Sequence, residues 1–221
     1  ARNRVAASER LAAARGRCLS LAAQELRGPG LALMAQAQRP EVGAVGPKLY
    51  ARDGTAACSA MVLGLGGAAG NPFAGNAADA DSYLDRLRLV QNWSALNLDC
   101  LLVRRELFHE LQGLDTQAFQ QDWFDADLCL RVREAGYLVV WTPFSRVIRL
   151  PSSMPGKERA DQQAFYQRWL GLVANDPAYN KNLSLKQGNF RLEPGLRSGW
   201  DPFIARAMPS VLALPFNASA V

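Results

Sequence analysis

A short acidic helix leads straight into an apolar strand between residues 122 and 143. This stretch reads DWFDADLCLRVREAGYLVVWTP. Apolar side chains recur at helical spacing from about Asp125 to Ala135, and Gly136 is a typical helix terminator. The run that follows is rich in β-branched and aromatic residues, which favour a strand. We expect that strand to stop at Pro143, because proline cannot donate to a sheet ladder.

Upstream segments extend this alternation of helix and strand. Residues 5–37 are rich in alanine and leucine and predict two helices, which the GPG at 28–30 breaks apart. Residues 41–49, EVGAVGPKL, predict a short buried strand. Asp53-Gly54 is a strong hairpin signal, so we expect residues 58–67 to return as the second strand of a hairpin.

The remaining segments indicate one mixed sheet with flanking helices. Residues 66–82 are rich in Gly, Ala, Asn and Asp and predict a mobile loop. Residues 97–111 predict a strand followed by a helix, and residues 158–176 predict a further helix. Strands separated by helices, with one hairpin inserted, imply an α/β fold. We expect residues 1–176 to form this domain. Residues 177–221 have too little periodicity for a second core, and we expect them either to wrap the first domain or to form an extension or linker toward a further domain.

The overall composition is that of a globular protein with a modest positive charge. Hydrophobic residues make up 49% of the chain, which indicates a packed core. The net charge is +5, but the basic residues are scattered, so we do not expect nucleic-acid binding. No apolar run reaches the ~18 residues that a membrane span needs, and no signal-peptide pattern opens the sequence. We therefore expect a cytoplasmic protein without a membrane span, and leave open a place at the inner face of the membrane.

Cysteine and histidine usage gives little support to a metal centre. The cysteines lie far apart in apolar settings and form no CxxC pair, so we expect buried free thiols. They are Cys18, Cys58, Cys100 and Cys129. His109 is the only histidine, and its surroundings predict a helix surface.

Three stretches, taken together and in this order, resemble the family 2 glycosyltransferases. They are RPEVGAVGPKLYARDGT at 39–55, CLLVRRELFHELQGLD at 100–115 and FDADLCLRVREAGYLVVWTPFSRV at 124–147. The third is the most specific, because the family typically has Glu-Asp-x-Asp-Leu-Cys-Leu-Arg, then Gly-Tyr, then an aromatic-x-Pro step. The resemblance covers roughly residues 12–150.

The resemblance implies the GT-A fold, a mixed β-sheet flanked by helices. The family normally supplies about a hundred residues before the matched part, which hold the nucleotide-binding half. We therefore expect an incomplete domain, cut from a large multi-domain bacterial protein of surface-polysaccharide (O-antigen-like) assembly. Its partners are then a nucleotide-sugar donor, a glycan acceptor and neighbouring domains of the same chain.

The resemblance also assigns roles to the acidic cluster. Family 2 enzymes are mostly inverting: an acceptor hydroxyl attacks the anomeric carbon, and a general base within hydrogen-bond reach takes its proton. That base corresponds to Asp125, and Asp127 is expected to orient neighbouring groups or the acceptor. Phe124 stands where the family usually has glutamate. The residues alone also fit a simpler interpretation, in which both aspartates stabilise the start of a helix.

The metal ligands of the family are replaced in this sequence. Its Asp-x-Asp motif, which usually holds Mg²⁺ or Mn²⁺, aligns with Ala22-Ala23-Gln24, which offers one neutral amide. The histidine that commonly follows the last strand aligns with Arg149. We therefore expect no divalent metal at this site. Instead, we expect Arg149 to bind the diphosphate, with Gln24 on the same side, since a guanidinium binds diphosphate bidentately. The alternative for Arg149 is an ordinary surface residue. Asp79 and Asp81 also form Asp-x-Asp, but in the predicted loop, as solvated charges.

Two classes of function follow. The first is a glycosyltransferase that uses Asp125 as its base and passes a sugar from a nucleotide-sugar to a glycan or lipid-linked acceptor. The second is a catalytically degenerate module that binds glycan or holds neighbouring domains together. Arg168 and Trp169 lie in YQRW, which is similar to the Gln-x-x-Arg-Trp motif of processive synthases. The glutamine of this sequence is out of place for that motif, however, so we expect Arg168 and Trp169 to pack on the acceptor side.

Overall fold

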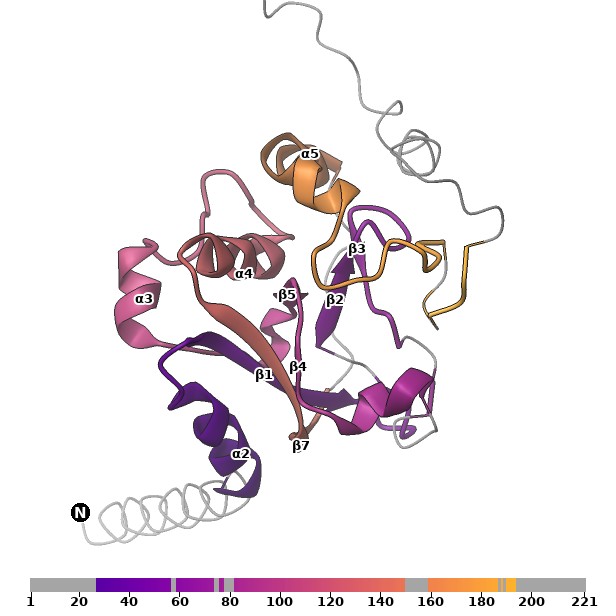
Figure 1. Ribbon diagram of the computed structural model, residues 1–221. Coiled ribbons are helices and arrows are strands. Elements are labelled where there is room, and N and C mark those ends of the chain that lie inside the picture. The colour runs from indigo at the N-terminus through magenta and orange to yellow at the C-terminus, as the bar shows by residue number, and fades with distance from the viewer. Residues whose placement is uncertain are drawn as a thin grey trace, which may run out of the picture.

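The computed structural model describes residues 27–56, 59–73, 76–77, 82–149, 159–186, 188 and 190–193 (Figure 1). The predicted first helix, Gln24, Cys18, Cys58 and the Asp79–Asp81 pair lie outside the described residues.

The described chain alternates helices with mostly short strands. The helices are α2 (Arg27–Ala37), α3 (Arg105–Glu110), α4 (Phe124–Glu134) and α5 (Arg159–Ala174), with 3-10 turns η1 (Tyr83–Arg88) and η2 (Leu98–Cys100). The strands are β1 (Val42–Tyr50), β2 (Ala60–Leu63), β3 (Ala69–Gly70), β4 (Gln91–Asn92), β5 (Ala95–Leu96), β6 (Leu102–Val103) and β7 (Leu138–Ile148).

The central sheet has four strands in the order β4-β7-β1-β6. Strands β1 and β7 are parallel, whereas β6 and β4 join them antiparallel at the two edges. Strand β1 is buried along almost its whole length, as expected for a parallel strand covered on both faces. The α/β class with a mixed sheet and flanking helices is thereby confirmed.

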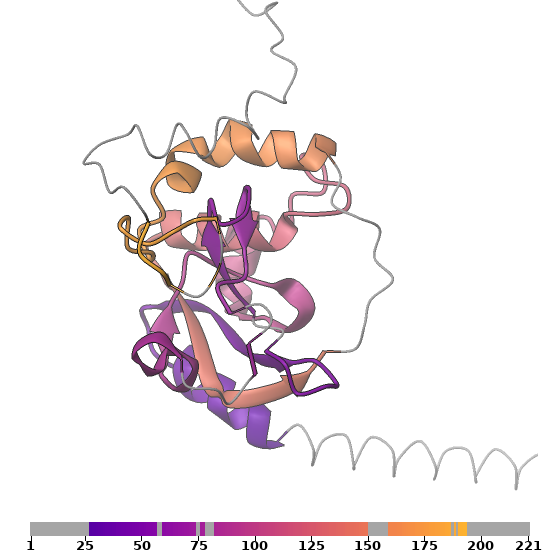
Figure 2. The same cartoon turned by 90° about the vertical axis from the view of Figure 1, so that its right-hand side faces the viewer.

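Helices cover the sheet on both sides (Figures 1 and 2). Leu33 of α2 packs on Val42, Val45 and Val140 beneath one face. The opposite face belongs to the larger core, which α4, α5 and a second, three-stranded sheet complete. The layers therefore run from α2 through the central sheet to α4, with α5 outermost (Figure 2).

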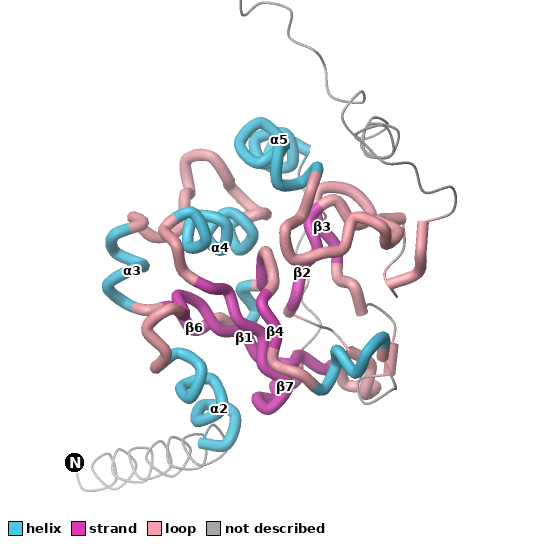
Figure 3. Tube along the Cα trace, viewed as in Figure 1, coloured by secondary structure: helices cyan, strands magenta, loops and turns pink. Residues whose placement is uncertain are grey.

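The predicted hairpin after β1 is half correct. A turn does form at Asp53-Gly54, where Asp53 accepts the Thr55 N–H at 2.9 Å and Gly54 has a φ of 81°. The return strand does not pair with β1, however. Strand β2 instead pairs with β3 and β5 in the three-stranded sheet (Figure 3).

Three other local predictions need correction. Strand β7 does not stop at Pro143, because the ladder with β1 skips from Thr142 to Arg146 and the proline lies in the resulting irregularity, where it has no ladder bond to make. The predicted mobile loop at 66–82 contains β3 and the fully buried Phe73. The GPG at 28–30 lies inside the first turn of α2, which tolerates proline, whereas the sequence placed it before the start of this helix.

The segment after α5 packs against the same core. Phe190 is 4% exposed and lies 5.2 Å from Phe73, measured between ring centroids. Asp176 accepts the Leu63 N–H at 2.7 Å and also the Ser94 hydroxyl, which ties the end of α5 to β2. Burial raises the pKa of Asp176 above its ordinary value, although these donors oppose the shift.

Candidate functional site

The acidic cluster lies at the start of α4, as the sequence predicts. The helix begins at Phe124 and ends at Glu134, with Gly136 at a φ of 88° just beyond it. Asp125 and Asp127 both lie in its first turn, where negative charge complements the helix dipole. The two side chains nevertheless have very different surroundings.

Asp127 is fully buried and occupied by three donors. Its Oδ2 accepts from Arg131 Nε at 2.8 Å, and its Oδ1 accepts from Arg168 Nη1 at 2.8 Å and from Trp169 Nε1 at 3.0 Å. Arg131 lies one turn further along α4, whereas Arg168 and Trp169 belong to α5. This carboxylate therefore joins the two helices inside the protein.

The two arginines extend this network to the loop between α3 and α4. Arg131 donates to the Leu111 carbonyl at 2.6 Å and to the Gly113 carbonyl at 2.8 Å. Arg168 donates to Asp115 Oδ2 at 2.8 Å. Hydrogen bonding to Asp127, assisted by Asp115, raises the pKa of Arg168 above its ordinary value. Ion pairs and backbone bonds thus fix α4 to its neighbours.

A second buried carboxylate shapes the turn before α4. Asp161 of α5 accepts three consecutive backbone N–H groups, from Gln120, Gln121 and Asp122, at 3.0, 2.7 and 2.9 Å. Burial alone would raise the pKa of Asp161, but these backbone donors outweigh it and hold the pKa below its ordinary value. Helix α5 therefore binds both the turn and the first turn of α4.

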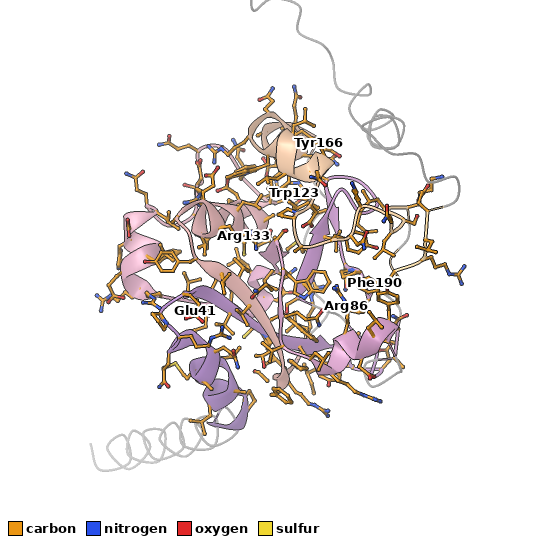
Figure 4. The ribbon with its side chains drawn as sticks, viewed as in Figure 1. Glu41, Arg86, Trp123, Arg133, Tyr166 and Phe190 are labelled. Carbon is orange, nitrogen blue, oxygen red and sulfur yellow. The ribbon has the colours of Figure 1, made fainter. Side chains whose placement is uncertain are left out.

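Trp123 also attaches the start of α4 to α5. It precedes α4 in the left-handed backbone region, with a φ of 69°, which is unfavourable for a bulky residue. Its ring stacks on Phe165 of α5 with centroids 4.9 Å apart, and its side chain is buried, which offsets that cost. Figure 4 shows Trp123 beneath α5, close to Tyr166.

Asp125 is only partly buried, in contrast to Asp127. Its Oδ1 accepts the N–H of Ala126 at 2.8 Å. One turn along the helix, Cys129 is fully buried against β5, where its thiol contacts the backbone of Leu96. Burial raises the pKa of Cys129 to about 12, with the charge of Asp125 adding to the shift. Asp125 therefore lies on the side of α4 that faces β5.

Arg149 follows β7 and pairs with an acidic side chain. Its Nε lies 2.7 Å from Asp99 Oδ2, with both side chains partly exposed. Its backbone N–H donates to the Tyr50 carbonyl at 2.7 Å, at the carboxyl end of β1. The structure thus brings Asp125 and Asp127 into one helical turn and places Arg149 at the strand ends, while Gln24 lies outside the described residues.

Sequence reasoning missed several residues that hold this region. Arg131 lies four residues after Asp127, a spacing that predicts a helical ion pair. Nothing local in the sequence links Asp127 to Arg168, 41 residues away, or Asp161 to the turn before α4. Within the part of the chain that the structure describes, no three His, Cys, Asp or Glu side chains gather as metal ligands would. No helix in that part is long and apolar enough to cross a bilayer.

Curated proteins similar to this chain come from three bacteria. The chain is 39% identical over 169 residues to the uncharacterized protein y4gI of Sinorhizobium fredii. It is 37% identical over 160 residues to the O-antigen biosynthesis protein RfbC of Myxococcus xanthus. It is 31% identical over 155 residues to the N-acetylglucosaminyl-diphospho-decaprenol L-rhamnosyltransferase of Mycobacterium tuberculosis.

These alignments cover most of this chain but only part of each relative. They take in 72%, 69% and 64% of the chain, and 19%, 12% and 49% of the three relatives in the same order. No model of a known protein family matches the chain, and no solved structure does. The similarity to proteins named for O-antigen biosynthesis and rhamnosyl transfer supports a glycosyltransferase family for this chain.

Proposed function

We propose that the chain is the acceptor-side part of a family 2 glycosyltransferase with the GT-A fold, acting in surface-polysaccharide assembly. The names of the Myxococcus and Mycobacterium relatives support a glycosyltransferase role in polysaccharide biosynthesis. The mixed sheet with helices on both faces is consistent with it. Residues 1–176 form the transferase domain in this proposal, and residues 177–221 extend it toward a further domain, with Tyr179, Leu183 and Phe190 packed into its core.

The reaction in this proposal is an inverting transfer from a nucleotide-sugar. An acceptor hydroxyl attacks the anomeric carbon, its proton passes to the carboxylate of Asp125, and the nucleoside diphosphate leaves from the opposite face of the sugar. The acceptor is a glycan or a lipid-linked sugar; the name of the Mycobacterium relative includes a diphospho-decaprenol, which favours the lipid-linked kind.

The contrast between the two aspartates is the observation that carries this assignment. Asp127 is consumed by three donors inside the protein, so it cannot accept a proton from a substrate. Asp125 is partly exposed on the first turn of a helix that α5 holds in place. A fixed helix end gives a general base the constant geometry that proton transfer needs. Asp127 then acts as a positioning residue.

Arg149 is the candidate for the diphosphate. In this proposal its guanidinium takes the place of a metal ion against the leaving group, with Gln24 on the same side. The ion pair with Asp99 keeps Arg149 at the strand ends and has to yield when a diphosphate binds. Diphosphate affinity that survives EDTA and falls in Arg149→Ala is the expected result; affinity that EDTA abolishes contradicts a metal-free site.

The transferase proposal is tested in the intact parent protein by measuring transfer of labelled sugar from its nucleotide-sugar. Asp125→Asn should lower the turnover number by about 10²–10⁴-fold, the usual contribution of a general base. Glu134→Gln is the matched control, because Glu134 is an exposed carboxylate at the other end of α4. Urea unfolding of each variant separates lost chemistry from lost folding.

The same experiment decides between enzyme and scaffold. Transfer that Asp125→Asn leaves unchanged would rule out this domain as the catalytic one, and a glycan-binding or scaffold role would replace it. Phe124, in the place of the usual glutamate, is the residue that favours this second function.

A further inference from the structure

The carboxyl ends of β1 and β7 carry an unusual concentration of exposed apolar side chains. Of the ten large hydrophobic side chains exposed in the described residues, five lie on or beside these strand ends. We call them the strand-end surface: Leu84, Leu89, Leu98, Phe144 and Ile148. Leu84, Phe144 and Ile148 are 72%, 68% and 65% exposed.

Strand register places Leu89 along the carboxyl half of β7. Gln91 of β4 pairs antiparallel with Trp141 of β7, so the chain preceding β4, with Leu89, runs back along the carboxyl half of β7. Lys48 of β1 donates to the Leu87 carbonyl at 3.1 Å and fixes η1 beside the same strands. Figure 1 shows η1 leading into β4 at the edge of the central sheet.

The other side of the surface is held by η2. Strand β6 runs antiparallel to β1, and η2 with Leu98 directly precedes it, so η2 lies beside the carboxyl half of β1. The ion pair between Asp99 and Arg149 joins η2 to the end of β7. Both 3-10 turns therefore flank the strand ends, one on each side.

The end of β7 alternates apolar and basic side chains toward solvent. Phe144, Arg146 and Ile148 are exposed, whereas Ser145 is buried and Val147 half-buried, which is the period of a strand with one open face. Arg146 and Lys48 both lie over the Tyr50 ring, with 5.7 Å and 5.5 Å to its centroid. Cationic side chains are thus held beside the apolar ones.

Charge around the strand-end surface is predominantly positive. In the described residues 49–54, 82–99 and 144–149 there are five Arg and three Asp side chains, and Lys48 is buried beneath them. Arg88 and Arg149 pair with Asp85 and Asp99 at the surface, and arginines outnumber aspartates in these ranges. Nucleic acid offers no apolar environment for protruding Leu and Ile side chains, whereas the boundary between lipid headgroups and acyl chains does.

We propose that the strand-end surface lies against an anionic phospholipid bilayer. Phe144, Ile148, Leu84 and Leu89 enter the boundary between headgroups and acyl chains, and Arg146 with its basic neighbours meets the lipid phosphates. The chain then lies on the membrane without spanning it. This inference does not depend on sugar transfer, because it rests on the exposure of Phe144 and Ile148 and on the charge of Arg146, residues to which the proposed function gives no part.

The test is co-sedimentation of the full chain with vesicles of phosphatidylcholine alone or with added phosphatidylglycerol. Binding should require phosphatidylglycerol and weaken as salt is raised. Phe144→Ser/Ile148→Ser should lower the partition coefficient by about tenfold or more. The matched control is Leu31→Ser/Met34→Ser, which removes two exposed apolar side chains from α2, on the other face of the sheet.

Several outcomes would overturn the proposal. They are absence of vesicle binding, equal binding to neutral vesicles, and equal losses in the two double variants. Binding of DNA or RNA that Phe144→Ser/Ile148→Ser abolishes would assign the surface to nucleic acid instead. Arg146→Gln provides the second arm: it should reduce binding to phosphatidylglycerol vesicles while the chain stays folded, since this side chain is exposed.

Discussion

Replacing Asp127 by asparagine tests whether buried charge fixes α4 to α5. The carboxylate has no exposed surface and accepts from Arg131, Arg168 and Trp169 at 2.8–3.0 Å. Asparagine keeps the shape but turns one oxygen into a donor, so at least one guanidinium faces an NH₂ group in place of an acceptor. Breaking a buried ion pair costs about 3–5 kcal/mol. Both arginines retain other acceptors, so we expect the free energy of unfolding to fall by about 2–4 kcal/mol.

Urea unfolding followed by tryptophan fluorescence measures this loss. Asp125→Asn is the matched control, since it changes a partly exposed carboxylate in the same helical turn and should cost at most about 1 kcal/mol. Combining Asp127→Asn with Arg168→Gln should give less than the sum of the two single losses, because the pair is lost only once.

A loss below about 1 kcal/mol for Asp127→Asn would refute this account, since a satisfied buried charge cannot be removed so cheaply. Strict additivity with Arg168→Gln would also refute it, because directly bonded side chains are expected to couple.

Three further predictions concern packing, thiol reactivity and pH. Gly43→Ala should destabilise the fold by about 1–3 kcal/mol by overpacking, because the new methyl would lie 2.7 Å from Val132 Cγ1; urea unfolding measures it, and an unchanged midpoint would show that the neighbours yield. Cys129, with a pKa of about 12 and full burial, should escape iodoacetamide at pH 8 until urea is added, as peptide mapping would show. The lowered pKa of Asp161 means that its contribution to stability is complete above the ordinary carboxyl pKa and is lost as pH falls through the lower folded-state value. Acid unfolding of Asp161→Asn should therefore converge with that of the unchanged protein once the pH lies below that folded-state value, and a constant difference would contradict this sign.

Local periodicity predicted the elements that carry most of the core. The helix from Asp125 and the buried strand at 41–49 both lie within a few residues of their observed limits, because an amphipathic repeat and a β-branched apolar run specify them directly. The partner of β2 was not predictable in the same way. Its apolar residues fit either sheet, and tertiary packing selected β3 and β5 in preference to β1.

Pro143 in β7 and Asp161 in α5 show a second limit of prediction from the sequence. Pro143 interrupts the ladder without ending β7, because the irregularity opposite Pro47 and Lys48 removes the need for its N–H. Asp161 gives no sign in the sequence that it binds a turn 40 residues away. Such contacts depend on how helices cross in space, which single-residue patterns do not encode.

Helical geometry also explains why Asp125 and Asp127 have different surroundings. Residues two positions apart on an α-helix point about 200° away from one another around its axis, so they do not share a face. When α4 packs with Asp127 toward α5, Asp125 must turn toward β5 and partial exposure, as observed. The two carboxylates of an Asp-x-Asp pair inside a helix therefore cannot coordinate the same metal ion. In α4 the pair supplies one buried anchor, Asp127, and one partly exposed carboxylate, Asp125, and this division follows from the sequence once the helix is recognised.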